Sequence, residues 1–152
     1  MQRYWLVKSE PSEFSIDDLQ KVKSTLWTGV RNYQARNFMT QAMKVGDKVF
    51  FYHSNAEPSG IAGVAVVASK AEPDPTAFDK KSDYFDEKSK KDSPTWQCVT
   101  VQFEKKTKFL ALDQLRKIKG LEEMLLLRKG QRLSIQPVSE REGEILFKSL
   151  DL

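Results

Sequence analysis

Apolar and polar positions along the chain predict several buried strands. Residues 3–10, "RYWLVKSE", carry apolar side chains on both faces, which is typical of a strand inside a sheet. Residues 47–54, "DKVFFYHS", show the same two-sided pattern, and residues 60–71, "GIAGVAVVASKA", add small residues that let another backbone approach closely. Two further strands are expected over residues 96–106 and 132–139.

Helical spacing occurs in the segments between these strands. Ser15 can cap a short helix whose first turn carries two aspartates, which suit the positive end of a helix dipole. Asn32 is a good N-cap for a second helix, and Gly46 lies where that helix is expected to end. The apolar positions that recur at helical spacing after this cap are Ala35, Phe38, Met39 and Ala42. We therefore expect this face of the helix to pack in the core.

The second half of the chain predicts shorter helices and one irregular region. Residues 111–118 and 121–127 are expected to form two short helices, and residues 140–150 an amphipathic one. Residues 72–95 hold three prolines and a dense run of mixed charge, which predicts an exposed excursion with little regular structure. Because separated strands alternate with helices, the pattern favours an α+β fold: a mixed, curved sheet or small open barrel with flanking helices.

The composition fits one folded domain over residues 1–152. Of the 152 residues, 39% are hydrophobic and 30% are charged, which is enough to bury a core without marking the chain as disordered. No apolar run has the length of a membrane span, and no signal peptide is expected. We expect a monomer located in the cytoplasm, or in the nucleus of a eukaryote.

A single cysteine and a single histidine limit the chemistry. Cys98 alone forms no intramolecular disulfide, which fits a reducing compartment, and one Cys with one His argues against a zinc site. A thiol nucleophile would have to use His53, yet Cys98 lies in mid-strand, where Cys is usually a small buried hydrophobe. No Gly-rich phosphate loop is present, and Glu10 is the one carboxylate flanked by several candidate site residues. We therefore expect no enzyme, no metal and no cofactor.

The net charge of +4 is modest, but its distribution along the chain is uneven. Between Lys105 and Arg132 there are nine Lys or Arg residues against three acids, a local excess of +6. Such a segment is either a pair of solvated helices or a binding surface for a phosphate backbone, and charge alone does not decide between them.

Four polar clusters lie where predicted strands and helices end. They are "SEP" (9–11), "WTGVRN" (27–32), "HSN" (53–55) and "RLSIQPVS" (132–139), the last of which supplies Arg132, Ser134 and Gln136. Each has an ordinary structural explanation: Ser9 and Asn32 as caps, the tryptophans as core residues, and His53 as a hydrogen-bonded core group. Four such clusters at the ends of elements, where sites tend to form, favour a pocket instead.

The same stretches carry a family resemblance. "YWLVKSEP", "WTGVRNYQARNFM", "GDKVFFYHSN", "GIAGVAVV" and "RLSIQPVS" resemble, in this order, the motifs of the EVE domain, a member of the PUA-like group. The resemblance runs from Tyr4 to about Leu150, and several of its motifs are long. It implies a curved, barrel-like sheet with flanking helices and a pocket that accepts a nucleobase of DNA or RNA, expected to be a modified one. It does not imply catalysis.

The residue types in the clusters suit such a ligand. Trp27 or Tyr33 can stack on the face of a base, which contributes about 1–3 kcal/mol, and polar groups can bind its edge. The residues expected to bind the nucleobase are Ser9, Glu10, Pro11, Trp27, Arg31, Asn32, Tyr33, His53, Ser54, Asn55, Arg132 and Ser134. Those expected to bind phosphate are Arg31, Arg36, Lys117, Lys119 and Lys129. The pattern leaves open which of Trp5, Trp27, Tyr33 and Trp96 faces the ligand.

Two other functions remain open from the sequence. One is an enzyme that acts on a nucleotide or modified base, with Glu10 or His53 as the acid or base. The other is a protein-interaction module that uses the basic segment 105–132. Turnover of a bound nucleoside would favour the enzyme, and binding that ignores salt would favour the protein module.

Overall fold

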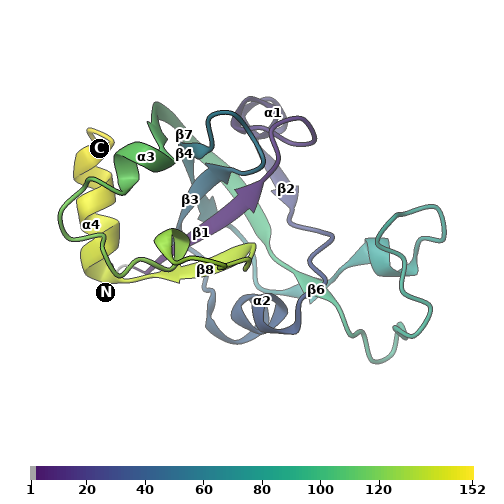
Figure 1. Cartoon of the computed structure of the whole chain (residues 1–152). Helices are drawn as coiled ribbons and strands as arrows, with labels where there is room; N and C mark the ends of the chain where they lie inside the picture. Colours follow the sequence, from purple (N-terminus) through teal and green to yellow (C-terminus); the bar gives the residue numbers. More distant parts are fainter. Residues whose placement is uncertain (1–2) are drawn as a thin grey trace.

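The computed structural model describes residues 3–152, which form a curved sheet surrounded by helices (Figure 1). Its strands are β1 (Tyr4–Ser9), β2 (Ser24–Leu26), β3 (Lys48–His53), β4 (Gly60–Val67), β5 (Glu72–Pro73), β6 (Gln97–Cys98), β7 (Thr100–Ala111) and β8 (Ile135–Val138). Its helices are α1 (Ile16–Val22), α2 (Tyr33–Asn37), the π-helical turn η1 (Phe38–Ala42), the 3₁₀ turns η2 (Pro75–Phe78) and η3 (Leu125–Leu127), α3 (Leu112–Leu115) and α4 (Glu140–Ser149).

The main sheet has six strands in the order β2-β7-β4-β3-β1-β8. β1 runs parallel to β3, and the other neighbouring pairs are antiparallel, so the sheet is mixed. Irregular register where β4 pairs with β3 and with β7 accompanies the bend of these strands, because a bulge increases local twist. The α+β fold predicted from the sequence, a mixed and curved sheet with flanking helices, is confirmed.

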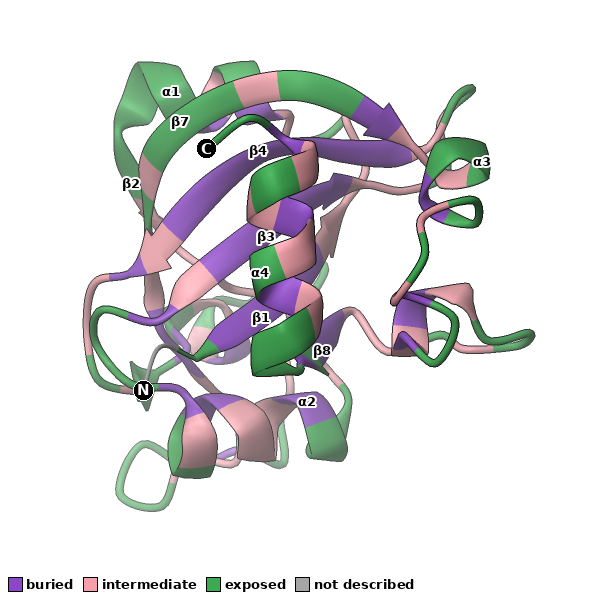
Figure 2. Cartoon of the chain, turned by 90° about the vertical axis from the view of Figure 1, so that its left-hand side faces the viewer, coloured by how far each residue is buried: buried purple, intermediate pink, exposed green. Residues whose placement is uncertain are grey.

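The central strands β1, β3 and β4 are buried on both faces, which explains their two-sided apolar pattern. In β1, Trp5 and Val7 join the core that α1 and α2 cover, whereas Tyr4 and Leu6 join the core on the opposite face. Figure 2 shows α4 lying across this second face, where it contributes the buried Leu146. A strand between two such layers exposes neither face to water.

Two predicted helix caps are confirmed in atomic detail. The Ser15 hydroxyl accepts a hydrogen bond from the Asp18 amide at 3.1 Å, and the Asp18 carboxylate accepts one from the Ser15 amide at 2.8 Å. This reciprocal capping box fixes the start of α1. At the start of α2, the Asn32 side-chain oxygen accepts a hydrogen bond from the Ala35 amide at 2.9 Å, which is a single N-cap bond.

Several predicted boundaries were wrong. β7 continues to Ala111, so the helix expected over 111–118 is reduced to Leu112–Leu115. The helix expected over 121–127 is only the 3₁₀ turn η3, because Leu121 and Met124 reach the core from an irregular segment rather than from one helical face. The strand expected over 132–139 covers only Ile135–Val138.

Other elements were not expected at all. β2, which pairs with β7 at the edge of the sheet, was missed because only three residues form it. The helix that starts at Asn32 changes to a π-helical turn after Asn37. In the predicted excursion over 72–95, β5 pairs with β6 and η2 follows, and the remainder has little regular structure and projects from the body of the molecule (Figure 1).

Gly143 is the residue that lets α4 lie close to the sheet. A Cβ atom at this position would overlap the Tyr4 ring, which itself packs edge-on against Phe147 at 5.5 Å. We predict that Gly143→Ala lowers the melting temperature, because overpacking costs about 1–3 kcal/mol and outweighs the gain in helix propensity of up to about 1 kcal/mol. Glu144→Ala, at an exposed position of the same helix, is the matched control. An unchanged or raised melting temperature for Gly143→Ala would contradict this packing.

Candidate nucleic-acid interface

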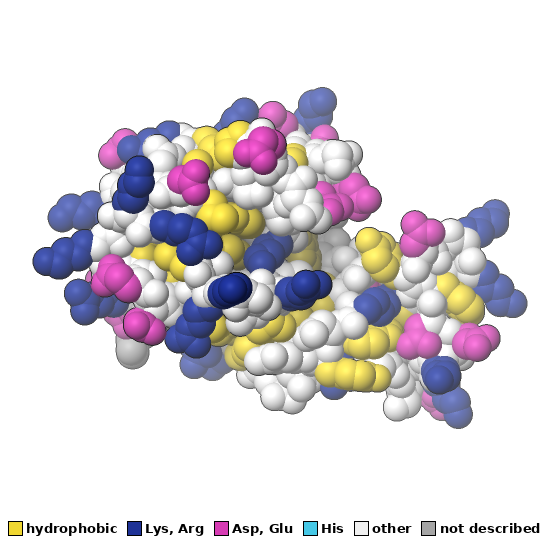
Figure 3. Space-filling model, in the orientation of Figure 1, with side chains coloured by type: hydrophobic (Ala, Val, Ile, Leu, Met, Phe, Trp, Pro, Cys, Tyr) yellow, Lys and Arg dark blue, Asp and Glu magenta, His cyan; other side chains and the backbone are white. Residues whose placement is uncertain are grey.

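A cleft of about 920 Å³ opens on the face of the molecule shown in Figure 3. Its walls come from five parts of the chain and from Tyr84 of the excursion. These parts are residues 8–10 and 13–14 around and after the end of β1, residues 25–31 in and after β2, residues 54–55 after β3, and Gln131, Arg132 and Ser134 before β8. Several Lys and Arg side chains surround the hollow on this face (Figure 3). Segments far apart in the sequence therefore meet at one site.

Trp27 forms the aromatic wall of this cleft. Its half-buried indole packs edge-on against Phe51 at 5.7 Å and Phe14 at 6.4 Å between ring centroids. The other two indole N–H groups donate to carboxylates, Trp5 to Asp47 at 2.9 Å and Trp96 to Asp86 at 2.8 Å. Within residues 3–152, the Trp27 indole N–H has no such acceptor. Trp27 therefore offers the cleft both an apolar ring and a hydrogen-bond donor.

Parallel pairing of β1 with β3 builds a second, polar wall. Ser9 lies opposite His53 in the ladder, and the Ser54 amide donates to the Ser9 carbonyl at 3.0 Å. Beyond this point the Asn55 side-chain amide donates to the Glu10 carboxylate across the two chain segments. Asn55 has a φ of 48°, in the left-handed region that Asn tolerates better than most residues. The Glu10–Asn55 pair thus presents an acceptor and an amide side by side at the cleft.

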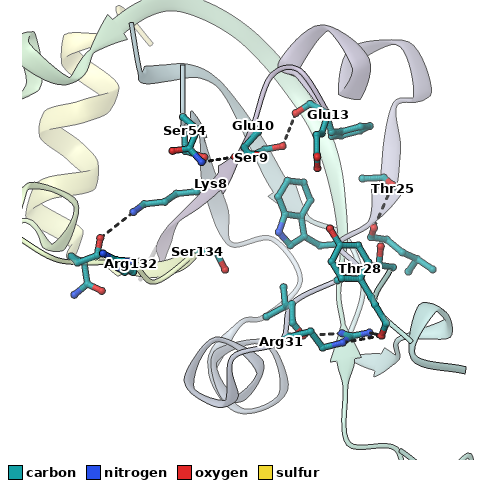
Figure 4. Close-up of a pocket in the computed structure, with 18 residues that line it drawn as sticks. Lys8, Ser9, Glu10, Glu13, Thr25, Thr28, Arg31, Ser54, Arg132 and Ser134 are labelled. Atoms are coloured by element: carbon teal, nitrogen blue, oxygen red, sulfur yellow. Dashed lines mark hydrogen bonds between the residues drawn. The ribbon is translucent and has the colours of Figure 1, made fainter. Parts of the chain in front are cut away.

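A basic wall lies on the β8 side. The Lys8 amide donates to the Ser134 carbonyl at 2.9 Å, which ties the segment before β8 to β1. The Lys8 ammonium lies 3.4 Å from the Gln131 carbonyl oxygen, and Arg132 stands beside it at the exposed rim (Figure 4). Burial lowers the pKa of Lys8 from its ordinary value.

Arg31 connects the cleft to the excursion. Its guanidinium donates to the Asp74 carboxylate at 3.1 Å, to the Tyr84 carbonyl at 2.6 Å and to the Thr76 hydroxyl at 3.2 Å. Asp74 is fully buried and also accepts from the Gly29 amide at 2.9 Å. Burial alone would raise the pKa of Asp74, but hydrogen bonds from Thr76, Gly29 and Arg31 outweigh it and lower that pKa. The guanidinium is therefore largely committed to holding residues 29–31 against the excursion.

The structure brings together eight of the residues predicted to bind the base. The residues that line the cleft are Ser9, Glu10, Trp27, Arg31, Ser54, Asn55, Arg132 and Ser134. Four others lie outside its lining: Pro11, Asn32, Tyr33 and His53. Asn32 uses its side-chain oxygen as a helix cap, and Tyr33 stacks on Trp96 at 4.9 Å with 61% of its surface exposed.

The residues predicted to bind phosphate are spread over the surface. Arg36 donates to the Asn37 side chain at 2.9 Å and to the Thr95 carbonyl at 3.0 Å, and its guanidinium lies over the Tyr33 ring. Lys117, Lys119 and Lys129 are exposed on the loops after α3 and η3, outside the lining of the cleft. Their role in binding a phosphate backbone stays a prediction.

Sequence reasoning missed several lining residues. These are Lys8, Glu13, Phe14, Thr25, Leu26, Thr28, Gly29, Val30, Tyr84 and Gln131. Thr28, Gly29 and Val30 lie inside the predicted cluster 27–32, where no role was assigned to them individually. Most of the others adjoin a predicted cluster, so widening each cluster by a few residues would have found them. Tyr84 gives no local signal, because it reaches the cleft only through the long-range contacts of Arg31.

The geometry gives no support to a Cys98–His53 pair. Cys98 is buried in β6, and burial raises the pKa of its thiol to about 12, with Asp74 and Glu72 adding to the shift. His53 lies at the end of β3, where its Nε2 accepts a hydrogen bond from the Ile16 amide at 3.1 Å. The two groups thus belong to different sheets, and the thiol keeps its proton at neutral pH.

The fold and the cleft belong to a known family of domains. The EVE domain family model matches residues 3–149, and the chain belongs to this family. It is 44% identical to human thymocyte nuclear protein 1, in an alignment that covers 97% of this chain and 73% of the human protein. The family predicted from the sequence motifs is confirmed. No helix within residues 3–152 is long and apolar enough to span a membrane.

Solved structures show the same fold. The crystal structure of human THYN1 in complex with 5-methylcytosine-containing DNA matches with a TM-score of 0.89 at 40% identity and covers 99% of both chains. The structure of a Leishmania major protein matches with a TM-score of 0.93 at 47% identity, over 99% of this chain and 96% of that one.

His53 makes the stability of the polar wall depend on pH. Burial lowers its pKa below the ordinary value of 6.5, so the unfolded chain takes up the proton at a higher pH than the folded chain does. We predict that stability is full above pH 6.5 and declines as the pH falls from there through the lower folded pKa. His53→Gln, which keeps an uncharged acceptor near Ile16, should flatten this decline. Melting temperatures of both proteins between pH 8 and about pH 5 test this, and parallel curves would contradict it.

Proposed function

We propose that this protein binds nucleic acid and takes one modified base of DNA into the cleft without chemical turnover. The observation that carries this proposal is Trp27, which presents an aromatic ring to a cleft that also holds the Glu10–Asn55 pair. Among residues 3–152, the Trp27 indole N–H has no hydrogen-bond acceptor. A base needs these same features: a flat apolar surface for its face, and a donor and an acceptor for its edge.

The size and position of the cleft support this function. A volume of about 920 Å³ is within the range of roughly 300–1,000 Å³ that is usual for small-ligand pockets. Arg132 at its rim suits contact with a polymer backbone outside. A base from a duplex would have to be flipped out to enter, which costs a few kcal/mol.

The relative's ligand gives the first base to test. The human THYN1 structure contains 5-methylcytosine DNA, and this chain is 40% identical to the protein chain in that structure, over 99% of both chains. A carboxylate such as that of Glu10 accepts a hydrogen bond, which suits the exocyclic amine of a cytosine-type base. Methylated cytosine is therefore the modified base that we infer first.

The same groups argue for a binding module rather than an enzyme. The Nε2 atom of His53 accepts a hydrogen bond from the Ile16 amide, the Cys98 thiol is buried, and Glu10 is held by Asn55. None of them is arranged as a base that activates a nucleophile. Fluorescence anisotropy tests this function by measuring the affinity for oligonucleotides that differ only at one position, which holds cytosine, 5-methylcytosine or thymine. We expect the oligonucleotide with 5-methylcytosine to bind most tightly. Equal affinities would contradict the proposal, and conversion of a bound nucleotide, followed by mass spectrometry, would support an enzyme instead.

Trp27 can be tested separately from the other aromatic residues. We predict that Trp27→Ala folds with a lower melting temperature and binds the preferred oligonucleotide roughly 5- to 150-fold more weakly, since base stacking contributes about 1–3 kcal/mol. Trp27→Phe keeps a ring against Phe14 and Phe51 but removes the N–H, so its affinity should lie between those of wild type and Trp27→Ala. Tyr33→Ala is the matched control outside the cleft. A binding loss in Tyr33→Ala but not in Trp27→Ala would assign the stacking role to Tyr33.

The exposed lysines after α3 and η3 should supply affinity without selectivity. We predict that replacing Lys117, Lys119 and Lys129 together by Gln weakens binding to modified and unmodified oligonucleotides by a similar factor. The dependence of affinity on salt should also become shallower, because fewer counterions are released. A triple Gln variant at Lys80, Lys81 and Lys88, exposed on the excursion, is the charge-matched control. Unchanged affinity and salt dependence in the first variant would show that these lysines are only solvated.

A further inference from the structure

Two cations of the cleft form no ion pair with any residue of the described part of the chain, 3–152. The five ion pairs within residues 3–152 involve Arg31, Lys48, Lys106, Lys108 and Arg128 as their cations. Lys8 and Arg132, which stand together on the basic wall, take part in none of them. Figure 4 shows this pair on one side of the cleft, with Thr28 and Arg31 on the other.

Lys8 differs from the surface lysines in its surroundings. It is half-buried, and its ammonium has one neighbouring acceptor, the Gln131 carbonyl oxygen at 3.4 Å. Burial is the cause that lowers its pKa, and no carboxylate offsets that effect. The nearest acid along the strand, Glu10, bonds Asn55 instead. A partly desolvated ammonium without a counter-ion is unfavourable, and an anion in the cleft would relieve this cost.

The arginines first expected to bind phosphate are used within the protein. Arg31 holds Asp74 and Tyr84, and Arg36 holds Thr95 and the Tyr33 ring. A phosphate that approached either guanidinium would compete with these contacts. Lys8 has donors left to give, since an ammonium carries three and only one weak contact is made here.

We propose that Lys8 binds the phosphate of the nucleotide whose base occupies the cleft, with Arg132 contacting the backbone at the rim. The inference rests on the proposed function and names the subsite that holds the backbone of the inserted nucleotide. Lys8 is set into the wall, so this contact forms with a nucleotide that has entered the cleft rather than with a backbone lying across the surface. Lys8 therefore contributes to selectivity, unlike the exposed lysines.

The test compares Lys8→Gln with wild type on oligonucleotides that carry one 5-methylcytosine or one cytosine. We expect Lys8→Gln to bind the modified oligonucleotide roughly tenfold more weakly or worse, as for the loss of a charge-assisted contact, and the unmodified one less than about twofold more weakly. For Lys8→Gln and the modified oligonucleotide, the slope of log affinity against log salt concentration should become shallower by about one. Lys8→Arg should retain most of the affinity. Lys48→Gln, whose lysine pairs with Glu104 outside the cleft and outside the basic segment 105–132, should change neither affinity.

A second measurement changes the oligonucleotide, and its first step uses only the wild-type protein. Replacing each phosphate next to the modified base by an uncharged methylphosphonate should weaken wild-type binding about tenfold at one position. At that position Lys8→Gln should bind no more weakly than wild type. The inference is overturned if no methylphosphonate replacement weakens wild-type binding. It is also overturned if Lys8→Gln lowers the affinity for the modified and the unmodified oligonucleotide equally, or lowers neither. Wild-type protein that fails to distinguish the modified oligonucleotide would instead overturn the proposed function itself.

Discussion

β1 and β3 run parallel in the middle of the sheet, and the site depends on this pairing. Parallel neighbours end at the same edge, so residues 9–10 and 54–55 emerge side by side although they are far apart in the chain. Both strands are buried on two faces, which holds their ends in place. The Glu10–Asn55 hydrogen bond joins the two segments just beyond the ladder. A rigid core thus positions polar groups that the loops alone could not fix.

The opposite wall depends on a second interaction, between Arg31 and the buried Asp74. Asp74 accepts hydrogen bonds from the Gly29 amide and from Thr76 as well, so residues 29–31 and the excursion share one carboxylate. The Arg31 guanidinium also lies over the Tyr84 and Trp96 rings, with its Cζ atom 5.6 Å and 5.2 Å from the two ring centroids. The irregular excursion is therefore fastened at its base, next to the Trp27 wall.

The sequence predicted most of the fold because its signals there are local. The caps at Ser15 and Asn32 need only a side chain and the next turn, and two-sided apolar strands need only a sandwiched sheet. The site was predicted in part. The sequence predicts that Arg31 binds the base and a flanking phosphate, from its charge and its place near a helix N-terminus, but its partner Asp74 lies 43 positions later, beyond any local pattern. Lys8 gives no such signal, since the lack of a carboxylate partner within residues 3–152 is visible only in three dimensions.

The cleft is asymmetric in charge, and this asymmetry bears on selectivity. Glu10 and Glu13 line one part of it, and Lys8 and Arg132 line another. These carboxylates repel a phosphate backbone that lies across them, because like charges at short range are unfavourable at low ionic strength. In the binding mode proposed above, an inserted nucleotide would avoid this repulsion, with its base at the carboxylate side and its phosphate at Lys8. The same charges would then weaken non-specific contact with the cleft and stabilise the inserted state, so that discrimination would arise from the arrangement of charges rather than from their sum.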